Sequence, residues 1–322
     1  MTIDRRSLLA TGFAAMAMPR SASADEFPSK PIRWVIPFPA AGNYDVTSRI
    51  VGEAMGRRLG QTIVMDNKPG AGGIVGLDAA LNAPADGYTV VMASFSVLFI
   101  APLMAKRPSM IATVAPLSIL TTVPMVIVAR PDSRFADMRA VLAEAKAKPG
   151  TVTIGHAGNG TSNHVDILRI QVSEKVQFNI VPYKGSGPGL NDLLGGSLDL
   201  YTDQLTTALP QIASGKLKAL VALSPERLPS LPDVPTLKDI GGTAFDGGTT
   251  AGLFVKAGTP APLIAKLNEG VTVALRDEAV VKRMAELGAV TRPTTPEHYA
   301  EFLKADEANV TPLITSGLLK PE

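Results

Sequence analysis

Short apolar runs alternate with helical patterns through the first third of the chain. Residues 34–36 (Trp, Val, Ile) form a run that is typical of a strand buried on both faces of a parallel sheet. Apolar residues then recur at helical spacing up to a stop at Gly60, which predicts a helix. The same patterns predict strands over residues 62–65 and 88–93 and helices over residues 74–82 and 97–106. This alternation predicts a parallel sheet with right-handed crossovers.

The alternation of strands and helices recurs in a second unit. An apolar run over residues 124–128 has no helix before it, and we interpret it as the crossing between the units. A helix over residues 135–148, capped by Ser133, is expected to follow. The later predicted strands are 151–155, 178–183, 199–203, 217–223 and a return strand 251–255, and the later predicted helices are 164–173, 188–194, 261–276, 278–287 and 296–308. We therefore expect an α/β fold with a first lobe over residues 25–123 plus 249–322 and a second over 124–248.

The first 24 residues have the features of an export signal. Arg5 and Arg6 begin it, a weakly apolar run follows, and the sequence Ala-Ser-Ala at 22–24 supplies a small-residue cleavage site. This pattern indicates the twin-arginine pathway, with a general secretory signal as the alternative. We expect the remaining chain to act in a bacterial periplasm.

The charge balance argues against partners that require a basic surface. The signal holds three arginines and one aspartate, so the rest of the chain keeps 28 basic and 28 acidic residues. Nothing in this balance favours nucleic acid or an anionic membrane as a partner. The absence of cysteine excludes disulfides, a thiolate nucleophile and a Cys-ligated metal, and we expect neither a cofactor nor a metal.

The loop after the first predicted strand has the chemistry of an anion site. Pro37 and Pro39 end the strand, and we expect Gly42 and Asn43 to adopt unusual backbone angles. Asn43 or Asp45 can cap the helix that follows. Strand, loop and helix N-terminus together direct N–H groups and a positive dipole end at one point. An ordinary strand-to-helix turn is the alternative interpretation.

Four other polar side chains stand at positions that suit either a ligand-binding or a structural role. Lys184 follows a strand and either meets a second carboxylate in a cleft or is a solvated loop lysine. Asp203 ends a strand and either meets a ligand amine, hydroxyl or water or caps the next helix. His156 and His164 bracket a glycine loop, but a metal pair without cysteine or nearby carboxylates is disfavoured. We expect His164 to bond to the loop backbone.

Seven segments of the chain occur in the order found in a known family. The chain resembles the periplasmic substrate-binding receptors of tripartite tricarboxylate transporters, often called Bug proteins. The matching segments are PSKPIRWVIPFPAAG (28–42), DNKPGAGG (66–73), ADGYTVVMAS (85–94), HAGNGTSNH (156–164), VPYKGSGPGLNDLLGGSLDL (181–200), LPDVPTL (231–237) and GTPAPLIAKLN (258–268).

The resemblance implies a two-lobed, type II periplasmic binding protein with two crossing strands as its hinge. Each lobe is then a mostly parallel sheet flanked by helices, and the lobes close on a small carboxylated molecule held mainly by loop amides and waters. The ligand-binding residues that we expect are Phe38, Ala40, Ala41, Gly42, Asn43, Asp45, Ser94, Ser96, Ala157, Gly158, Asn159, Thr161, Ser162, His164, Tyr183, Lys184 and Asp203.

This chain departs from the family pattern at two places. Ala40-Ala41 and Asn43-Tyr44 replace glycine and small residues, and residues 247–250 replace a bulky aromatic. We expect Tyr44 to fill one wall of the site and the region near Thr249 to be hollow.

The resemblance implies a non-catalytic receptor that delivers an organic acid or amino-acid-like ligand to membrane subunits of a tripartite carrier. We expect it to be a monomer. Two alternatives stay open: an exported hydrolase-like enzyme that uses Ser162 or Ser186 with a histidine, and a ligand-loaded partner of a signalling receptor. No arrangement of nucleophile, base and orienting group is visible in the sequence, which disfavours the enzyme.

Overall fold

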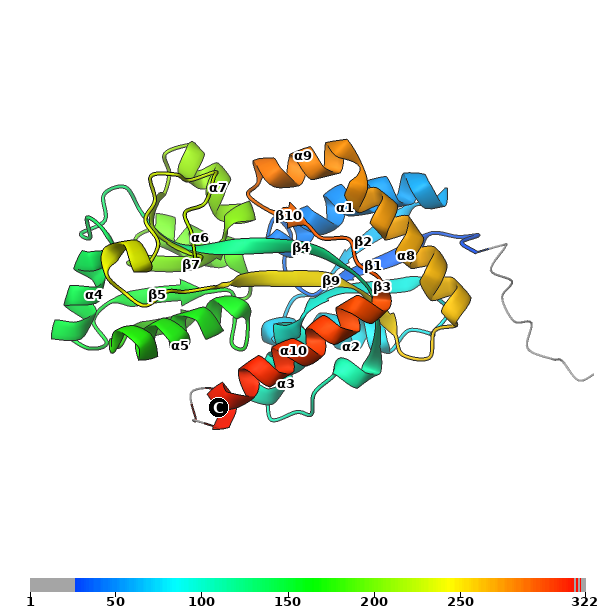
Figure 1. The fold of residues 1–322 in the computed structure, drawn as a ribbon, viewed down its shortest axis with the longest axis horizontal. Helices are drawn as coiled ribbons and strands as arrows, with labels where there is room; N and C mark the ends of the chain where they lie inside the picture. Colours follow the sequence, from blue (N-terminus) through cyan, green and yellow to red (C-terminus); the bar gives the residue numbers. More distant parts are fainter. Residues whose placement is uncertain (1–26, 316, 318, 320–322) are drawn as a thin grey trace, which may run out of the picture.

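Two long strands join the two lobes of the protein. The computed structural model describes residues 27–315, 317 and 319, so the predicted export signal lies outside the described residues. Strands β4 (Val114–Ala129) and β9 (Gly248–Lys256) run between the lobes (Figure 1). Residues 114–124 of β4 pair with β9, whereas residues from Met125 onward pair with β7 and β8. The division into lobes between residues 123 and 124 and between residues 248 and 249 stays a proposal.

The first lobe has a mixed sheet in the order β2-β1-β3-β9-β4. Strands β1 (Ile32–Ile36), β2 (Ile63–Asn67) and β3 (Thr89–Ser94) are parallel, as the sequence predicts, and β9 is antiparallel to β3. The side chains of Trp34, Val35 and Ile36 are fully buried, because helices cover both faces of the sheet.

The second lobe repeats this plan around a separate apolar core. Strands β5 (Thr153–His156), β6 (Asn179–Pro182) and β7 (Leu200–Gln204) are parallel in the order β7-β5-β6. Both β7 and β8 (Lys218–Leu223) pair antiparallel with the far end of β4. The carboxyl ends of the parallel strands in both lobes therefore lead into loops that face the space between the lobes.

Helices flank both sheets. They are α1 (Asn43–Leu59), α2 (Ile74–Leu81), α3 (Ala101–Met104), α4 (Met138–Ala147), α5 (Ser162–Glu174), α6 (Ser186–Leu194), α7 (Leu205–Ala213), α8 (Ala261–Arg276), α9 (Glu278–Glu286) and α10 (Pro296–Thr315). A short strand, β10 (Val290–Thr291), pairs with β4. Within the described residues, no helix is both long and apolar enough to cross a membrane.

Three predicted elements differ from the structure. The crossing strand begins ten residues earlier than predicted, because residues from Val114 onward, including Pro116 and Pro124, pair with β9. The helix predicted over 97–106 is a π-helical turn (Ser96–Ile100) followed by the short α3. Helix α4 begins at Met138, and its cap is Asp137, whose side chain accepts a hydrogen bond from the Ala140 N–H at 2.9 Å. The Ser133 cap is therefore wrong: Ser133 Oγ accepts from the Phe135 N–H at 3.3 Å.

Candidate functional site

A cavity lies between the lobes, where the N-termini of four helices meet. The start of α1 and the turn after β3 line it from the first lobe, and the starts of α5, α6 and α7 line it from the second. The lining residues are Phe38, Pro39, Gly42, Asn43, Tyr44, Ser94, Ser96, Val97, Ala157, Thr161, Ser162, Asn163, Ser186, Gly187, Gln204 and Thr249.

Helix dipoles, and not charged side chains, give the cavity its electrostatic character. Among the described residues that line it, none is a lysine or an arginine. The first N–H groups of a helix have no partner within the helix, and together they carry about half a positive charge. Convergence of such ends without competing cations favours a small anion.

The backbone angles and hydrogen bonds of the first loop (residues 37–42) differ from the prediction. Gly42 has ordinary extended angles (φ −82°, ψ 170°), and the left-handed residue is Ala41 with φ 64°. Neither Asn43 nor Asp45 caps α1, because Gly42 occupies the cap position. The Asp45 carboxylate instead accepts from the Ala41 N–H at 2.9 Å, so this N–H already has a partner.

Asp45 is held in its charged form inside the first lobe. Although burial by itself raises the pKa of Asp45, hydrogen bonds from Arg49, the Ala41 N–H and Asn67 outweigh it and hold that pKa below its ordinary value. The Arg49 guanidinium lies 2.9 Å from the carboxylate and neutralises it. Asp45 therefore fixes the shape of the first loop without lining the cavity.

The side chain of Asn43 supplies an unused hydrogen-bond donor. It is 4% exposed, and its Oδ1 accepts from Thr206 Oγ1 of the second lobe at 2.7 Å. Its Nδ2 has no hydrogen-bond partner, and it is the one fully buried side-chain nitrogen or oxygen of the described cavity lining that lacks one. A buried amide donor without a partner costs roughly 1–3 kcal/mol. A ligand oxygen in the cavity would remove that cost.

A polar network forms the wall of the cavity in the second lobe. Ser186 Oγ donates to Asp203 Oδ1 at 2.6 Å, and Thr207 Oγ1 also donates to this carboxylate. Gln204 Nε2 donates to Asn163 Oδ1 at 3.2 Å, and Asn163 Nδ2 donates to the Thr202 carbonyl at 2.8 Å. The orientations of the polar groups in this wall are therefore largely fixed before a ligand binds.

The two histidines support the glycine loop between them. Their rings are stacked, with centroids 4.5 Å apart. The Gly158 N–H donates to His156 Nδ1 at 3.1 Å, and the Gly160 N–H donates to His164 Nδ1 at 3.2 Å. Burial, together with the nearby His164, lowers the pKa of His156 to about 3, so His156 is neutral at pH 7. No group of three or more potential metal-ligating side chains occurs in the part of the chain that the structure describes.

The lobes contact each other directly around the cavity. Ser96 Oγ of the first lobe lies 2.9 Å from Ser162 Oγ of the second. A Cβ atom added to Gly160 would lie 2.5 Å from Ala101 Cα, and one added to Gly72 would lie 2.5 Å from the Asn159 carbonyl oxygen. Glycines therefore allow the backbones of the two lobes to approach closely at these two contacts.

The structure brings together about half of the predicted site residues. Those that line the cavity are Phe38, Gly42, Asn43, Ser94, Ser96, Ala157, Thr161 and Ser162. Gly158, Asn159, Tyr183 and Lys184 line a separate outer hollow beside it, whereas Ala40, Ala41, Asp45, His164 and Asp203 line neither. Contact of any of these residues with a ligand stays a prediction.

Lys184 and Asp203 both lie outside the cavity lining, and contact of either with a ligand stays a prediction. Lys184 is exposed in the outer hollow, and Asp203 is fully buried behind Ser186. Neither side chain lines the cavity where the far end of a ligand was expected.

Eight lining residues were absent from the predicted set: Pro39, Tyr44, Val97, Asn163, Ser186, Gly187, Gln204 and Thr249. Most of them directly follow a predicted site residue in the sequence. Tyr44, Asn163 and Ser186 also lie in the first turn of a predicted helix or just before it, and that position was a usable signal. Tyr44 and Thr249 both line the cavity, and the hollow expected near Thr249 stays a prediction.

Comparisons with known proteins agree with this architecture. The family model described as "Tripartite tricarboxylate transporter family receptor" matches residues 47–318. Protein BugT of Bordetella pertussis is 35% identical over 292 residues, which cover 88% of this chain and 88% of BugT. The structure of the periplasmic binding protein BugD has a TM-score of 0.86 at 31% identity and covers 92% of this chain and 100% of BugD.

A further solved structure is that of MatC from Rhodopseudomonas palustris with bound malate. It has a TM-score of 0.82 at 31% identity, over 88% of this chain and 98% of MatC. These matches confirm the two-lobed periplasmic-binding-protein fold predicted from the sequence. Because the family model covers most of the chain, the protein belongs to the family of tripartite tricarboxylate transporter receptors.

Proposed function

We propose that the protein is a periplasmic receptor that captures a small carboxylated compound between its lobes and delivers it to a tripartite membrane carrier. The observation that carries this proposal is the unpaired Nδ2 of Asn43, buried among helix N-termini in a cavity that no lysine or arginine of the described residues lines. A carboxylate oxygen would accept from Asn43 and from the N–H groups at the helix starts. The malate bound to the related MatC supports the same ligand class.

Domain closure is the mechanism that fits this site. The cavity is lined from both lobes, so a bound ligand stabilises only the arrangement in which the lobes meet. Asn43 itself links them, because Thr206 of the second lobe donates to its Oδ1. Strands β4 and β9 are the hinge in this proposal, and release to the carrier follows when the lobes separate.

The enzyme alternative receives no support from the serine contacts. Ser162 Oγ pairs with Ser96 Oγ, and Ser186 Oγ donates to a carboxylate, so neither bond supplies a histidine base to activate the oxygen. The family and its structural relatives are solute-binding proteins, which fits a non-catalytic role.

Transport and sensing use the same ligand-loaded state. A loss of uptake of the bound acid in a deletion strain distinguishes transport.

Thermal-shift screening followed by calorimetry tests the ligand class. Organic acids, amino acids, aromatic acids, sugars and nucleotides are compared, and we expect carboxylates to raise the melting temperature. At about a thousand times the dissociation constant, a ligand adds roughly 4 kcal/mol to the free energy of unfolding. A melt that responds only to sugars or nucleotides contradicts the proposal.

Variants at Asn43 test the observation directly. Asn43→Ala should weaken carboxylate binding about tenfold or more, because a hydrogen bond to a charged group contributes roughly 1.5–3 kcal/mol. Asn43→Asp should abolish binding, since it places a negative charge against the ligand. Asn179→Ala, at an exposed asparagine on β6, is the control and should bind as the natural protein does. Unchanged affinity in Asn43→Asp would show that the anion lies elsewhere.

A further inference from the structure

The hydroxyl of Ser186 has a fixed direction in the cavity wall. Ser186 is the first residue of α6, lines the cavity, and is buried. Its Oγ lies 2.6 Å from Asp203 Oδ1, whereas the alternative acceptor, Gln204 Oε1, lies at 3.5 Å. A serine hydroxyl has one hydrogen and two lone pairs. With that hydrogen directed at Asp203, the oxygen can only accept a hydrogen bond from a ligand.

Asp203 has a strong requirement for this hydrogen. Its side chain is fully buried. The carboxylate accepts hydrogen bonds from Ser186, Thr207 and the Gln204 backbone. Burial raises the pKa of Asp203 to about 6, so the carboxylate is still mostly ionised at pH 7 and accepts only. Turning the Ser186 hydrogen away would leave a buried charge with one donor fewer, which is costly.

The charge of Asp203 also changes the electrostatics of the second-lobe wall. Asp203 lies at the end of β7, next to the N-terminus of α7, and bonds to the first residue of α6. A carboxylate at helix N-termini offsets their positive ends. The wall at Ser186 is therefore less suited to an anion than the wall at Asn43, where an amide donor is unpaired.

We propose that the cavity selects carboxylates that also carry a hydroxyl or ammonium group, which donates to Ser186 Oγ while the carboxylate lies at Asn43. Asp203 is the positioning residue that makes Ser186 an acceptor, and it acts without touching the ligand. This inference rests on the proposed function, because it assumes that the carboxylate occupies the Asn43 end. It names the ligand class more narrowly: hydroxy acids and amino acids in preference to simple acids of the same length.

Matched ligand pairs test the preference by calorimetry on the full mature chain. The pairs are malate with succinate, aspartate with succinate, lactate with propionate, and mandelate with phenylacetate. We expect the hydroxy or amino member of at least one pair to bind tenfold or more tightly than its partner. The malate and aspartate arms distinguish a hydroxyl from an ammonium donor. Equal or tighter binding by the unsubstituted member in every pair that binds overturns the inference and leaves the proposed function intact. Failure of all carboxylates overturns both.

Two variants test the role of the wall. Ser186→Ala should remove the preference within a pair, so that the substituted acid binds no more tightly than the unsubstituted one. Asp203→Asn replaces one of the two acceptor oxygens by a donor, so Ser186 Oγ is no longer held as an acceptor alone and the preference should fall, although the ligand never contacts this residue. Ser214→Ala, at an exposed serine after α7, should keep the preference. A preference retained in both wall variants overturns the inference. If either variant fails to fold by circular dichroism, the pair measurement on the natural protein decides.

Discussion

Substitution of Gly160 by alanine should hold the two lobes apart. An added Cβ would lie 2.5 Å from Ala101 Cα and 2.8 Å from the Ala101 nitrogen, whereas non-bonded carbon atoms need about 3.5 Å. The lobes would therefore have to separate locally by about 1 Å. Overpacking of this kind costs roughly 1–3 kcal/mol, and only in the closed form. We expect the affinity for the best carboxylate of the thermal-shift screen to fall roughly 5- to 150-fold.

Backbone strain must be separated from this steric effect. Gly160 has φ 75°, and a left-handed alanine costs about 1–2 kcal/mol in the open and closed forms alike. Gly150→Ala is the matched control, because Gly150 has φ 78° and no atom within 4 Å of the added Cβ. Calorimetry should show a loss of affinity only in Gly160→Ala, and X-ray scattering should show a larger radius of gyration with ligand. Equal affinities in the two folded variants would refute the reasoning.

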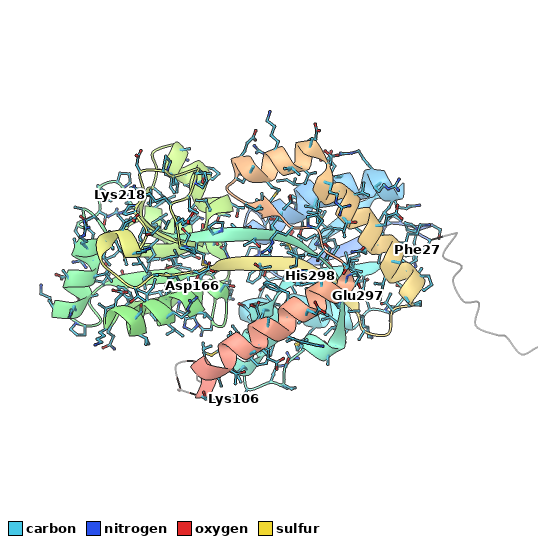
Figure 2. The ribbon with its side chains drawn as sticks, in the orientation of Figure 1. Phe27, Lys106, Asp166, Lys218, Glu297 and His298 are labelled. Carbon is cyan, nitrogen blue, oxygen red and sulfur yellow. The ribbon has the colours of Figure 1, made fainter. Side chains whose placement is uncertain are left out.

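Three further predictions concern export and stability. Arg5→Lys combined with Arg6→Lys should stop twin-arginine export, which fractionation of periplasm measures; unchanged export would point to the general pathway. Burial raises the pKa of Asp166, beside β9 (Figure 2), to about 7 against the partial opposition of Arg169. The folded form therefore binds more protons than the unfolded form between pH 4 and 7, so the free energy of unfolding should decline across that range by up to roughly 4 kcal/mol. Asp166→Asn should make this decline smaller in urea titrations at pH 5 and 8, because Asp203 and Asp306, whose pKa values burial raises to about 6, keep their own contributions. An unchanged slope would exclude Asp166 as a source of the decline. Asp137→Ala should lower the unfolding free energy by about 1 kcal/mol through the lost cap, measured by urea titration. An equal loss in a Ser133→Ala control would contradict this assignment.

Local pattern was sufficient for most of the elements, although not for α7, and for part of the site in the first lobe. The apolar run at Trp34 predicted a strand buried on both faces, because parallel sheets covered by helices need continuous apolar residues. The glycine loop after it predicted an anion site at the start of α1, and Gly42 and Asn43 do line the cavity. These features depend on neighbours in sequence, so the sequence by itself determined them.

Tertiary structure decided which of the strand-end side chains reach the cavity. Lys184 follows β6 and Asp203 lies near the end of the parallel strand β7, yet one lies in the outer hollow and the other is covered by Ser186. Thr249 lines the cavity only because β9 pairs with β4 in a register that places it opposite Val123. Cover by a neighbouring helix and register between distant strands are long-range relations, and no local pattern of residues specifies them.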